Sequence, residues 1–145
     1  MAAVESIESL RLLLASLIRS RVVGDDPDDR MAAVMLAPGD RWFADDRPIR
    51  RVHADASMFV GGLRALLLQS LHPLAMAGVA QHSDFRNDPW GRLQRTADFL
   101  AATTFGPATL ATETIARINH VHSFVHGTTT DGEPYSARDP HLLRW

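Results

Sequence analysis

Apolar residues recur at the three- and four-residue spacing of a helix along the first stretch of the chain, ESIESLRLLLASLIRSRVV. They share one face, so residues 1–24 are predicted to form an amphipathic helix that ends in the turn-forming sequence GDDPDDR, Gly24–Arg30. Charged residues divide this stretch, which excludes the uninterrupted apolar core of a signal peptide. The interrupting side chains are Glu5, Glu8, Arg11 and Arg19.

The middle of the chain predicts a loop followed by a broken helix. Residues 31–55 contain APGDRW and DDRP and are predicted to be loop, with one short extended piece at IRRVH. Residues Phe59–Ala80 are strongly apolar and helical, and Pro73 lies inside them. Because proline lacks an N–H and its ring clashes with the preceding turn, the helix should kink or restart near His72.

Two long helices are predicted in the second half of the chain. The first should begin with Asp88 as its N-cap and Pro89 in its first turn, and should end near Gly106. The second is expected over residues 107–126, with Gly127 as its C-cap. Strand signals are weak, so the pattern predicts an all-α fold in a single domain.

The end of the chain repeats the signals of a helix start. Asp139 is a suitable N-cap, Pro140 suits the first turn, and the chain stops within two turns at Trp145. A helix this short is unstable alone because nucleation is costly. The domain over residues 1–145 is therefore expected to be incomplete at its C-terminus, or to be completed by a second copy in a homo-oligomer.

The sequence NHVHSFVHG, Asn119–Gly127, contains three histidines that fall on different faces of the helix predicted over 107–126. At 100° per residue, His122 lies in the middle of the apolar stripe, His120 lies nearly opposite, and His126 lies at the edge of the stripe. One ring is thus expected to be buried and one exposed. The other members of the stripe are Ala111, Ile115, Ile118 and Val125.

The preceding helix also places polar groups on its apolar face. Arg92 and Thr96 fall within the stripe formed by Leu93, Phe99, Leu100 and Thr103. A guanidinium on a core face costs several kcal/mol unless an anion or a carbonyl meets it. His72 is a third polar residue that is expected to face inward, because the helix break at Pro73 leaves backbone groups that need hydrogen-bond partners. These positions are candidates for holding a buried cofactor.

Structural explanations remain open for the same residues. A histidine on an apolar stripe is more often a core residue whose ring bonds to a backbone carbonyl, and Arg92 could pair with Asp84, Asp88 or another acid. His122 and His126 are spaced to bind zinc together, but zinc needs three or four ligands and no further ligand motif is present. His120 and His141 are expected to be solvated.

Composition narrows the classes of function. The net charge of -2 argues against nucleic acid as the main partner, because neutralising phosphates requires a basic face. The chain has no cysteine, which excludes disulfides and thiol catalysis, and all fifteen basic residues are arginine, which excludes lysine Schiff bases. No run reaches the roughly 18 apolar residues of a membrane span. The protein is therefore expected to be cytoplasmic.

A series of motifs resembles one protein family. In order, they are an HP dipeptide in an apolar helix, HSDF, DPWGRLxRT, NxxH and GTTxDGxxYSAxDPxLLxW, running from about Arg50 to Trp145. This part of the chain is similar to the bacterial haem-dependent oxygenases grouped with the latex-clearing (rubber oxygenase) proteins and the MpaB-type enzymes. The resemblance implies an all-helical fold with haem b held between helices.

The resemblance also implies roles for individual residues. The family's proximal iron ligand, in the NxxH pattern, falls on His122, and the Arg and Thr of its R-x-x-x-T motif fall on Arg92 and Thr96. Arg95 corresponds to the family's basic residue before the Thr. Arg92 is then expected to balance a haem propionate or to orient the pocket, with Thr96 forming a hydrogen bond nearby. The reaction is expected to insert O2 into a small apolar or unsaturated intracellular substrate.

The chain also departs from the family pattern. Family members continue beyond the LLxW run, and the rubber-cleaving members use a glutamate base on the distal side of the haem. No carboxylate lies between Asp55 and Asp84, so that role is vacant or falls to Gln69 or Gln81, neither of which is a base. An alternative of another class is a non-catalytic, truncated helical module that binds a partner chain or oligomerises through its apolar faces.

Overall fold

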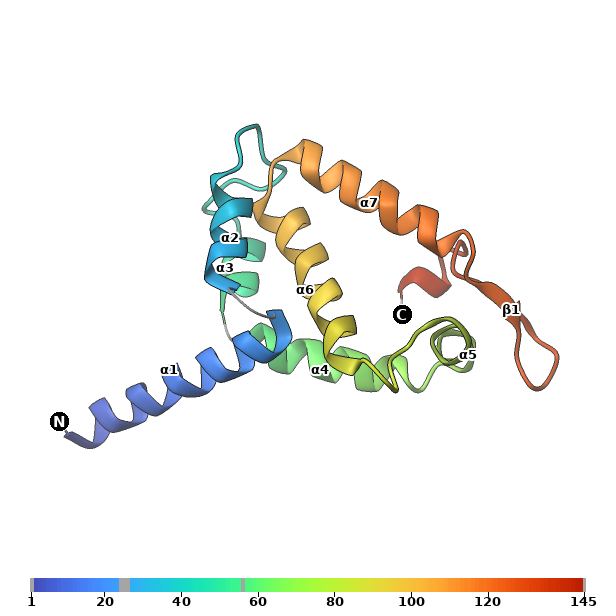
Figure 1. Cartoon of the computed structure of the whole chain (residues 1–145), viewed down its shortest axis with the longest axis horizontal. Helices are drawn as coiled ribbons and strands as arrows, with labels where there is room; N and C mark the ends of the chain where they lie inside the picture. The colour runs from blue at the N-terminus through green and yellow to red at the C-terminus, as the bar shows by residue number, and fades with distance from the viewer. Residues whose placement is uncertain (1, 24–26, 56, 145) are drawn as a thin grey trace.

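The computed structural model describes residues 2–23, 27–55 and 57–144. They are mostly helical, as the sequence predicts (Figure 1). The helices are α1 (Ala2–Val23), α2 (Pro27–Leu36), α3 (Pro48–Ala54), α4 (Ser57–Gln69), α5 (Pro73–His82), α6 (Pro89–Phe105) and α7 (Ala108–His122). The strands are β1 (His126–Thr128) and β2 (Pro134–Ser136), and a 3₁₀ turn covers Leu142–Arg144.

Helix α6 lies at the centre of the arrangement. It contacts α7, α1, α2 and α3, and α1 extends away from the rest of the molecule toward the N-terminus (Figure 1). Asp88 caps α6 as predicted, because its Oδ1 accepts a hydrogen bond from the Gly91 N–H at 2.8 Å. Pro89 occupies the first turn, and Gly106 follows the last helical residue.

The predicted break at Pro73 is confirmed. Helices α4 and α5 are bent by 102° at this point, because Pro73 occupies the first turn of a new helix. His72 is the N-cap of α5, and its Nδ1 accepts a hydrogen bond from the Ala75 N–H at 3.3 Å. Among the described residues, no single helix is long and apolar enough to cross a membrane, whereas α4 and α5 pass that test of length and composition only as a bent pair.

Two predictions for the first third of the chain are wrong. Residues 27–36 form α2, although GDDPDDR was expected to be a turn and the residues after it a loop. The piece IRRVH, expected to be extended, lies in α3. Both helices begin with a proline, Pro27 and Pro48, whose fixed φ suits a first helical turn. Packing of both helices on α6 supplies the stabilisation that their short lengths lack.

The predicted end of the last long helix is also wrong. Helix α7 ends at His122 rather than at residue 126, and Gly127 lies in a strand instead of capping the helix. Strands β1 and β2 form an antiparallel hairpin in which Gly127 is opposite Tyr135. Gly132 takes a positive φ of 85° in the turn, a conformation that favours glycine. The hairpin packs on α5, and this tertiary contact overrides continuation of the helix.

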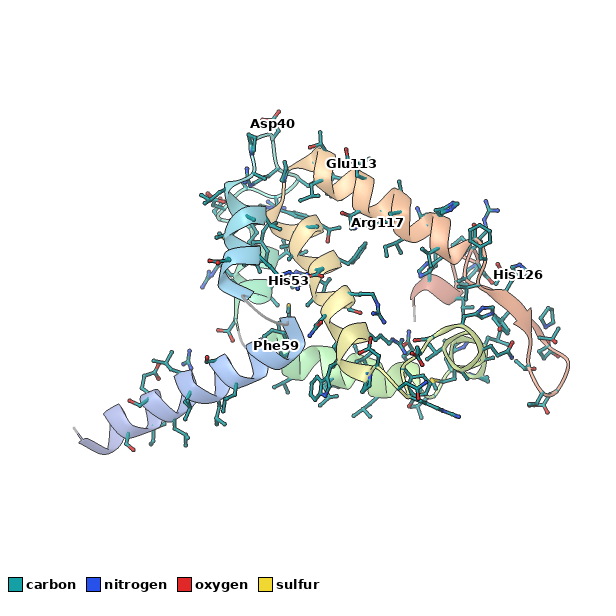
Figure 2. The ribbon with its side chains drawn as sticks, viewed as in Figure 1. Asp40, His53, Phe59, Glu113, Arg117 and His126 are labelled. Atoms are coloured by element: carbon teal, nitrogen blue, oxygen red, sulfur yellow. The ribbon has the colours of Figure 1, made fainter. Side chains whose placement is uncertain are left out.

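The apolar core is small. Among the described residues, the buried apolar side chains are Ala75, Ala102, Phe105, Ala111 and Tyr135. Large apolar residues of α1 and α4 remain exposed, including Leu10, Leu14, Val60, Leu63 and Leu67. Polar contacts therefore contribute much to fixing the position of α6. One of these joins α3 to α6 (Figure 2), where Nδ1 of His53 lies 2.8 Å from Oγ1 of Thr104.

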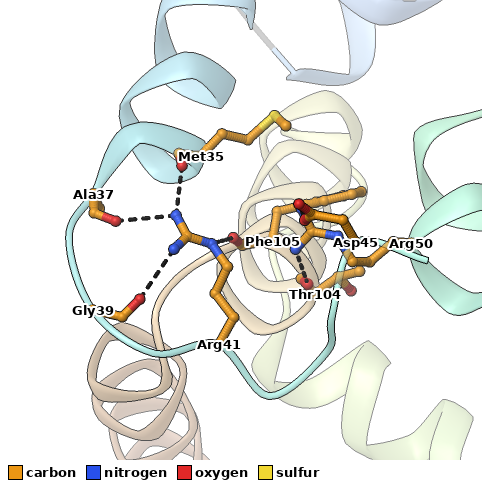
Figure 3. A network of polar contacts seen from close by, with 8 residues as sticks. All are labelled: Met35, Ala37, Gly39, Arg41, Asp45, Arg50, Thr104 and Phe105. Carbon is orange, nitrogen blue, oxygen red and sulfur yellow. Dashed lines mark hydrogen bonds and ion pairs between the residues drawn. The ribbon is translucent and has the colours of Figure 1, made fainter. Parts of the chain in front are cut away.

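Two arginines bind the backbone at the C-terminal end of α6 (Figure 3). Nε of Arg41 donates to the carbonyl of Phe105 at 2.9 Å, and its other nitrogens donate to the carbonyls of Met35, Ala37 and Gly39. Arg41 therefore joins the ends of α2 and α6, where helical carbonyls have no partner within the helix.

Arg50 on α3 is the second of these arginines, and it is buried. Its Nη1 donates to the Thr104 carbonyl at 3.4 Å, and its Nη2 lies 2.8 Å from Oδ1 of Asp45. Its guanidinium lies 5.2 Å from the centre of the Phe105 ring, within the range of a cation–π contact. The buried charge thus has an anion, a carbonyl and an aromatic face around it.

Arg41→Ala should lower the free energy of unfolding by about 1.5–3 kcal/mol, because hydrogen bonds from a charged donor to carbonyls at two helix ends are lost. Arg47→Ala is the matched control. Arg47 is exposed, no side-chain hydrogen bond caps α3 from it, and its loss should change stability by less than about 0.5 kcal/mol. Urea melts of both variants measure the difference; equal stabilities would contradict the role given to Arg41.

Candidate functional site

His122 is the last residue of α7, and its side chain is half-buried. In the part of the chain that the structure describes, its Nδ1 is the buried side-chain nitrogen or oxygen that has no hydrogen-bond partner. A buried polar atom without a partner costs about 1–3 kcal/mol. The structure therefore does not supply the backbone carbonyl expected of a purely structural core histidine, and this ring nitrogen remains available to another group.

His120 and His122 differ in burial, as their predicted helix faces require, whereas the prediction for His126 is wrong because α7 ends before that residue. His120 is exposed, and its ring packs edge-on against Phe124 with centroids 5.1 Å apart. His126 is exposed in β1, beyond the end of α7 (Figure 2). No group of three or more His, Cys, Asp or Glu side chains in the described ranges could hold a metal ion together. A zinc site built from several of these histidines is therefore not formed.

Arg92 lies in the first half of α6 and is half-buried. Its Nη2 donates to Oε1 of Gln69 on α4 at 3.2 Å. Burial lowers the pKa of Arg92, and the nearby positive charge of Arg95 lowers it further. None of the ion pairs among the described residues includes Arg92. The pairing with Asp84 or Asp88 that the sequence left open is not formed, and the guanidinium is bound only by a neutral amide.

Thr96 and Arg95 lie one turn further along α6. The periodicity places Thr96 on the inner face, whereas its side chain is exposed, and its Oγ1 donates to the Arg92 carbonyl at 3.0 Å. Arg95 is exposed and pairs with Asp88, with Nη1 and Oδ2 3.4 Å apart. The reason is that the core lies around the C-terminal half of α6, at Ala102 and Phe105, so the apolar stripe is covered at one end only.

His72 and Gln69 lie on either side of the sharp bend between α4 and α5. The Nδ1 atom of His72 is engaged as the cap of α5, and Gln69 bonds to Arg92. The bend thus brings one end of α4, the start of α5 and the first half of α6 into one polar junction. His122 belongs to a different element, and no hydrogen bond joins it to Arg92 or His72 in the described chain.

A second polar cluster joins the hairpin to α5 and was not predicted. The buried Tyr135 donates from its hydroxyl to Oε1 of Gln81 at 2.7 Å, and Nε2 of His82 lies 3.1 Å from the same hydroxyl. Nε2 of Gln81 donates to the Thr128 carbonyl at 3.0 Å. The hairpin could have been predicted from the DG pair in GTTTDGEPYS, because Asp-Gly in a short loop is typical of a hairpin turn. This cluster fixes the chain that leaves α7 after His122.

Comparison with known proteins gives one family match. The model of the family described as "ER-bound oxygenase mpaB/B'/Rubber oxygenase, catalytic domain" matches residues 50–145, about two thirds of the chain. The match begins within α3, runs to the end of the chain and includes every candidate site residue. No curated protein and no solved structure matches the chain significantly.

Gly127→Ala should destabilise the hairpin. A Cβ at this position would lie 2.8 Å from the Tyr135 hydroxyl oxygen and 3.0 Å from Oε1 of Gln81, so the polar cluster must shift, at a cost of about 1–3 kcal/mol. Gly61→Ala on α4 is the control, because its Cβ would meet open space and alanine is the better helix former, by about 1 kcal/mol. Thermal melts should therefore move in opposite directions; a stabilised Gly127→Ala variant would show that the hairpin does not pack on α5 as described.

Proposed function

Because the chain belongs to the family of the ER-bound oxygenase mpaB/B' and rubber oxygenase catalytic domains, we propose that it is a haem b-dependent oxygenase in which His122 binds the iron. One observation carries the proposal. Nδ1 of His122 is buried without a hydrogen-bond partner among the described residues. Imidazole is a common iron ligand, and a buried ring nitrogen without a partner supports a role of His122 toward a group outside the protein chain.

The residues present fit such a cofactor. A haem is held by an iron ligand and by cationic or polar groups that bind its carboxylates, and His122 on α7 and Arg92 on α6 would supply these. Arg92 is suitable because its guanidinium is half-buried and meets no carboxylate in the described chain. Thr96 and Arg95 follow it along α6, and His72 lies at the bend next to Gln69, so these residues would border the same group.

The protein's own residues would orient the cofactor and exclude water from one of its sides. When bound, haem b would supply the binding and activation of O2. Arg92 would hold a carboxylate by charge-assisted hydrogen bonds, and Thr96 would contribute a hydroxyl beside it. The exposed apolar face of α4, formed by Val60, Leu63 and Leu67, precedes Gln69 in the same helix and would offer apolar contact to a small apolar or unsaturated substrate. We place this reaction in the cytoplasm.

A second candidate function is favoured by the exposed apolar side chains. Val60 is 70% exposed, Leu63 60% and Leu67 64%, and all three lie on one face of α4. A face of this kind on a folded protein commonly binds another protein. The alternative is therefore a non-catalytic helical module that pairs with a second copy through α4.

The haem proposal predicts that the chain purified with haem shows a Soret absorption band. His122→Ala should abolish or shift the band, because it removes the ring with the unmet nitrogen. His120→Ala is the matched control and should leave the band unchanged, because that ring is exposed and packs against Phe124. Equal loss of the band in both variants would contradict the assignment of the ligand to His122.

The alternative predicts self-association without haem. A variant carrying Leu63→Glu and Leu67→Glu should shift the molar mass toward the monomer, because it places charges in the apolar face. Ala65→Glu is the control, since Ala65 is exposed on the opposite side of α4. Sedimentation equilibrium measures the masses; a monomeric wild-type chain would rule out the module that pairs through α4.

A further inference from the structure

The partner of Arg92 is unusual for a guanidinium that is partly removed from water. A half-buried cation is normally stabilised by a carboxylate, because an amide oxygen offers much weaker electrostatic compensation. Arg92 instead donates to Oε1 of Gln69 at 3.2 Å. Glutamate has nearly the same shape as glutamine and would form a stronger pair with Arg92. The amide at this position therefore leaves the positive charge uncompensated.

The acid that caps α6, Asp88, is engaged elsewhere. Oδ1 of Asp88 accepts from the Gly91 N–H at 2.8 Å, and its Oδ2 pairs with Arg95 at 3.4 Å. Arg95 adds a second positive charge one turn from Arg92, and together with burial this charge lowers the pKa of Arg92. The surroundings of Arg92 thus raise the free energy of its charged form, and no described acid offsets that increase.

We propose that Gln69 is a positioning residue that orients Arg92 toward a carboxylate of the bound cofactor without neutralising its charge. This inference rests on the proposed haem function and deepens it. The Gln69 amide fixes the guanidinium through one nitrogen, and a guanidinium has five N–H donors in a planar fork, so donors remain for a bidentate bond to a carboxylate. A glutamate at position 69 would compete with that carboxylate for the same fork.

The test compares two probes that share the porphyrin and its iron but differ in whether the propionate groups are charged. Haem b carries two propionates, whereas haem dimethyl ester carries none, and the Soret band gives the dissociation constant of each from the full chain. The wild type should bind haem b at least about tenfold more tightly than the ester, the effect expected of one charge-assisted hydrogen-bonded contact. Arg92→Leu should bind the two probes alike.

Gln69→Glu is the decisive variant. It keeps the side-chain shape and adds a negative charge beside Arg92, so the preference for haem b over the ester should fall to within about threefold. Gln69→Leu leaves Arg92 charged but removes the amide that orients it. Its preference for haem b over the ester should lie between those of the wild type and Gln69→Glu. Gln94→Glu is the matched control, because it makes the same change of charge on α6 at a residue with no hydrogen bond to Arg92, and its preference should equal that of the wild type.

The outcomes separate the two proposals. A Gln69→Glu variant that retains the full wild-type preference, with a far-UV spectrum and melting temperature like those of the wild type, overturns the role of Gln69 while haem binding stands. The same holds if Gln94→Glu loses the preference as strongly, because the effect is then one of net charge alone. A wild-type chain that binds neither probe overturns the haem function and this inference together. If Gln69→Glu is unfolded, the Gln69→Leu variant decides: a preference equal to that of the wild type excludes a positioning role.

Discussion

The hydrogen bonds that Arg41 and Arg50 donate to the last carbonyls of α6 are the constraint on which the arrangement of the helices depends. Among the residues whose burial the structure describes, too few apolar side chains are buried to fix these helices by packing alone. Carbonyls at a helix end accept bonds in defined directions, so they hold α2, α3 and α6 in one geometry. The Phe105 ring, buried beneath Arg50, adds the apolar part of the same contact.

The two ends of α6 therefore differ in the hydrogen-bond partners and the burial of their side chains. At the C-terminal end, each arginine meets oxygen atoms that satisfy it, and the side chains of Ala102 and Phe105 are buried. At the N-terminal end, Arg92 meets one neutral amide, and Thr96 is exposed. A rigid helix held firmly at one end presents the side chains at its other end in fixed positions. This separation leaves the α6 members of the candidate site, Arg92 and Thr96, at the open end of the helix.

The sequence predicts those features that depend on local chemistry. The cap at Asp88, the break at Pro73 and the opposite orientations of His120 and His122 follow from side-chain capping, the missing proline N–H and helical periodicity. Features that depend on distant contacts were not predictable. The helical state of IRRVH comes from packing on α6, and the hairpin forms because Tyr135 finds Gln81 and His82 on α5. Helical periodicity placed Thr96 on the apolar face of α6. It could not show that this part of the face remains exposed in the fold.

The scarcity of large buried side chains affects how this protein responds to temperature and denaturant. The heat capacity change of unfolding and the denaturant m-value both scale with the apolar surface that unfolding exposes. Much of the apolar surface of α1 and α4 is already exposed in the folded chain. We therefore expect a flat curve of stability against temperature and an unfolding transition that extends over a wide range of denaturant concentration. A ligand that covers the exposed faces sharpens the transition as well as raising its midpoint, because the complex then has more surface to expose.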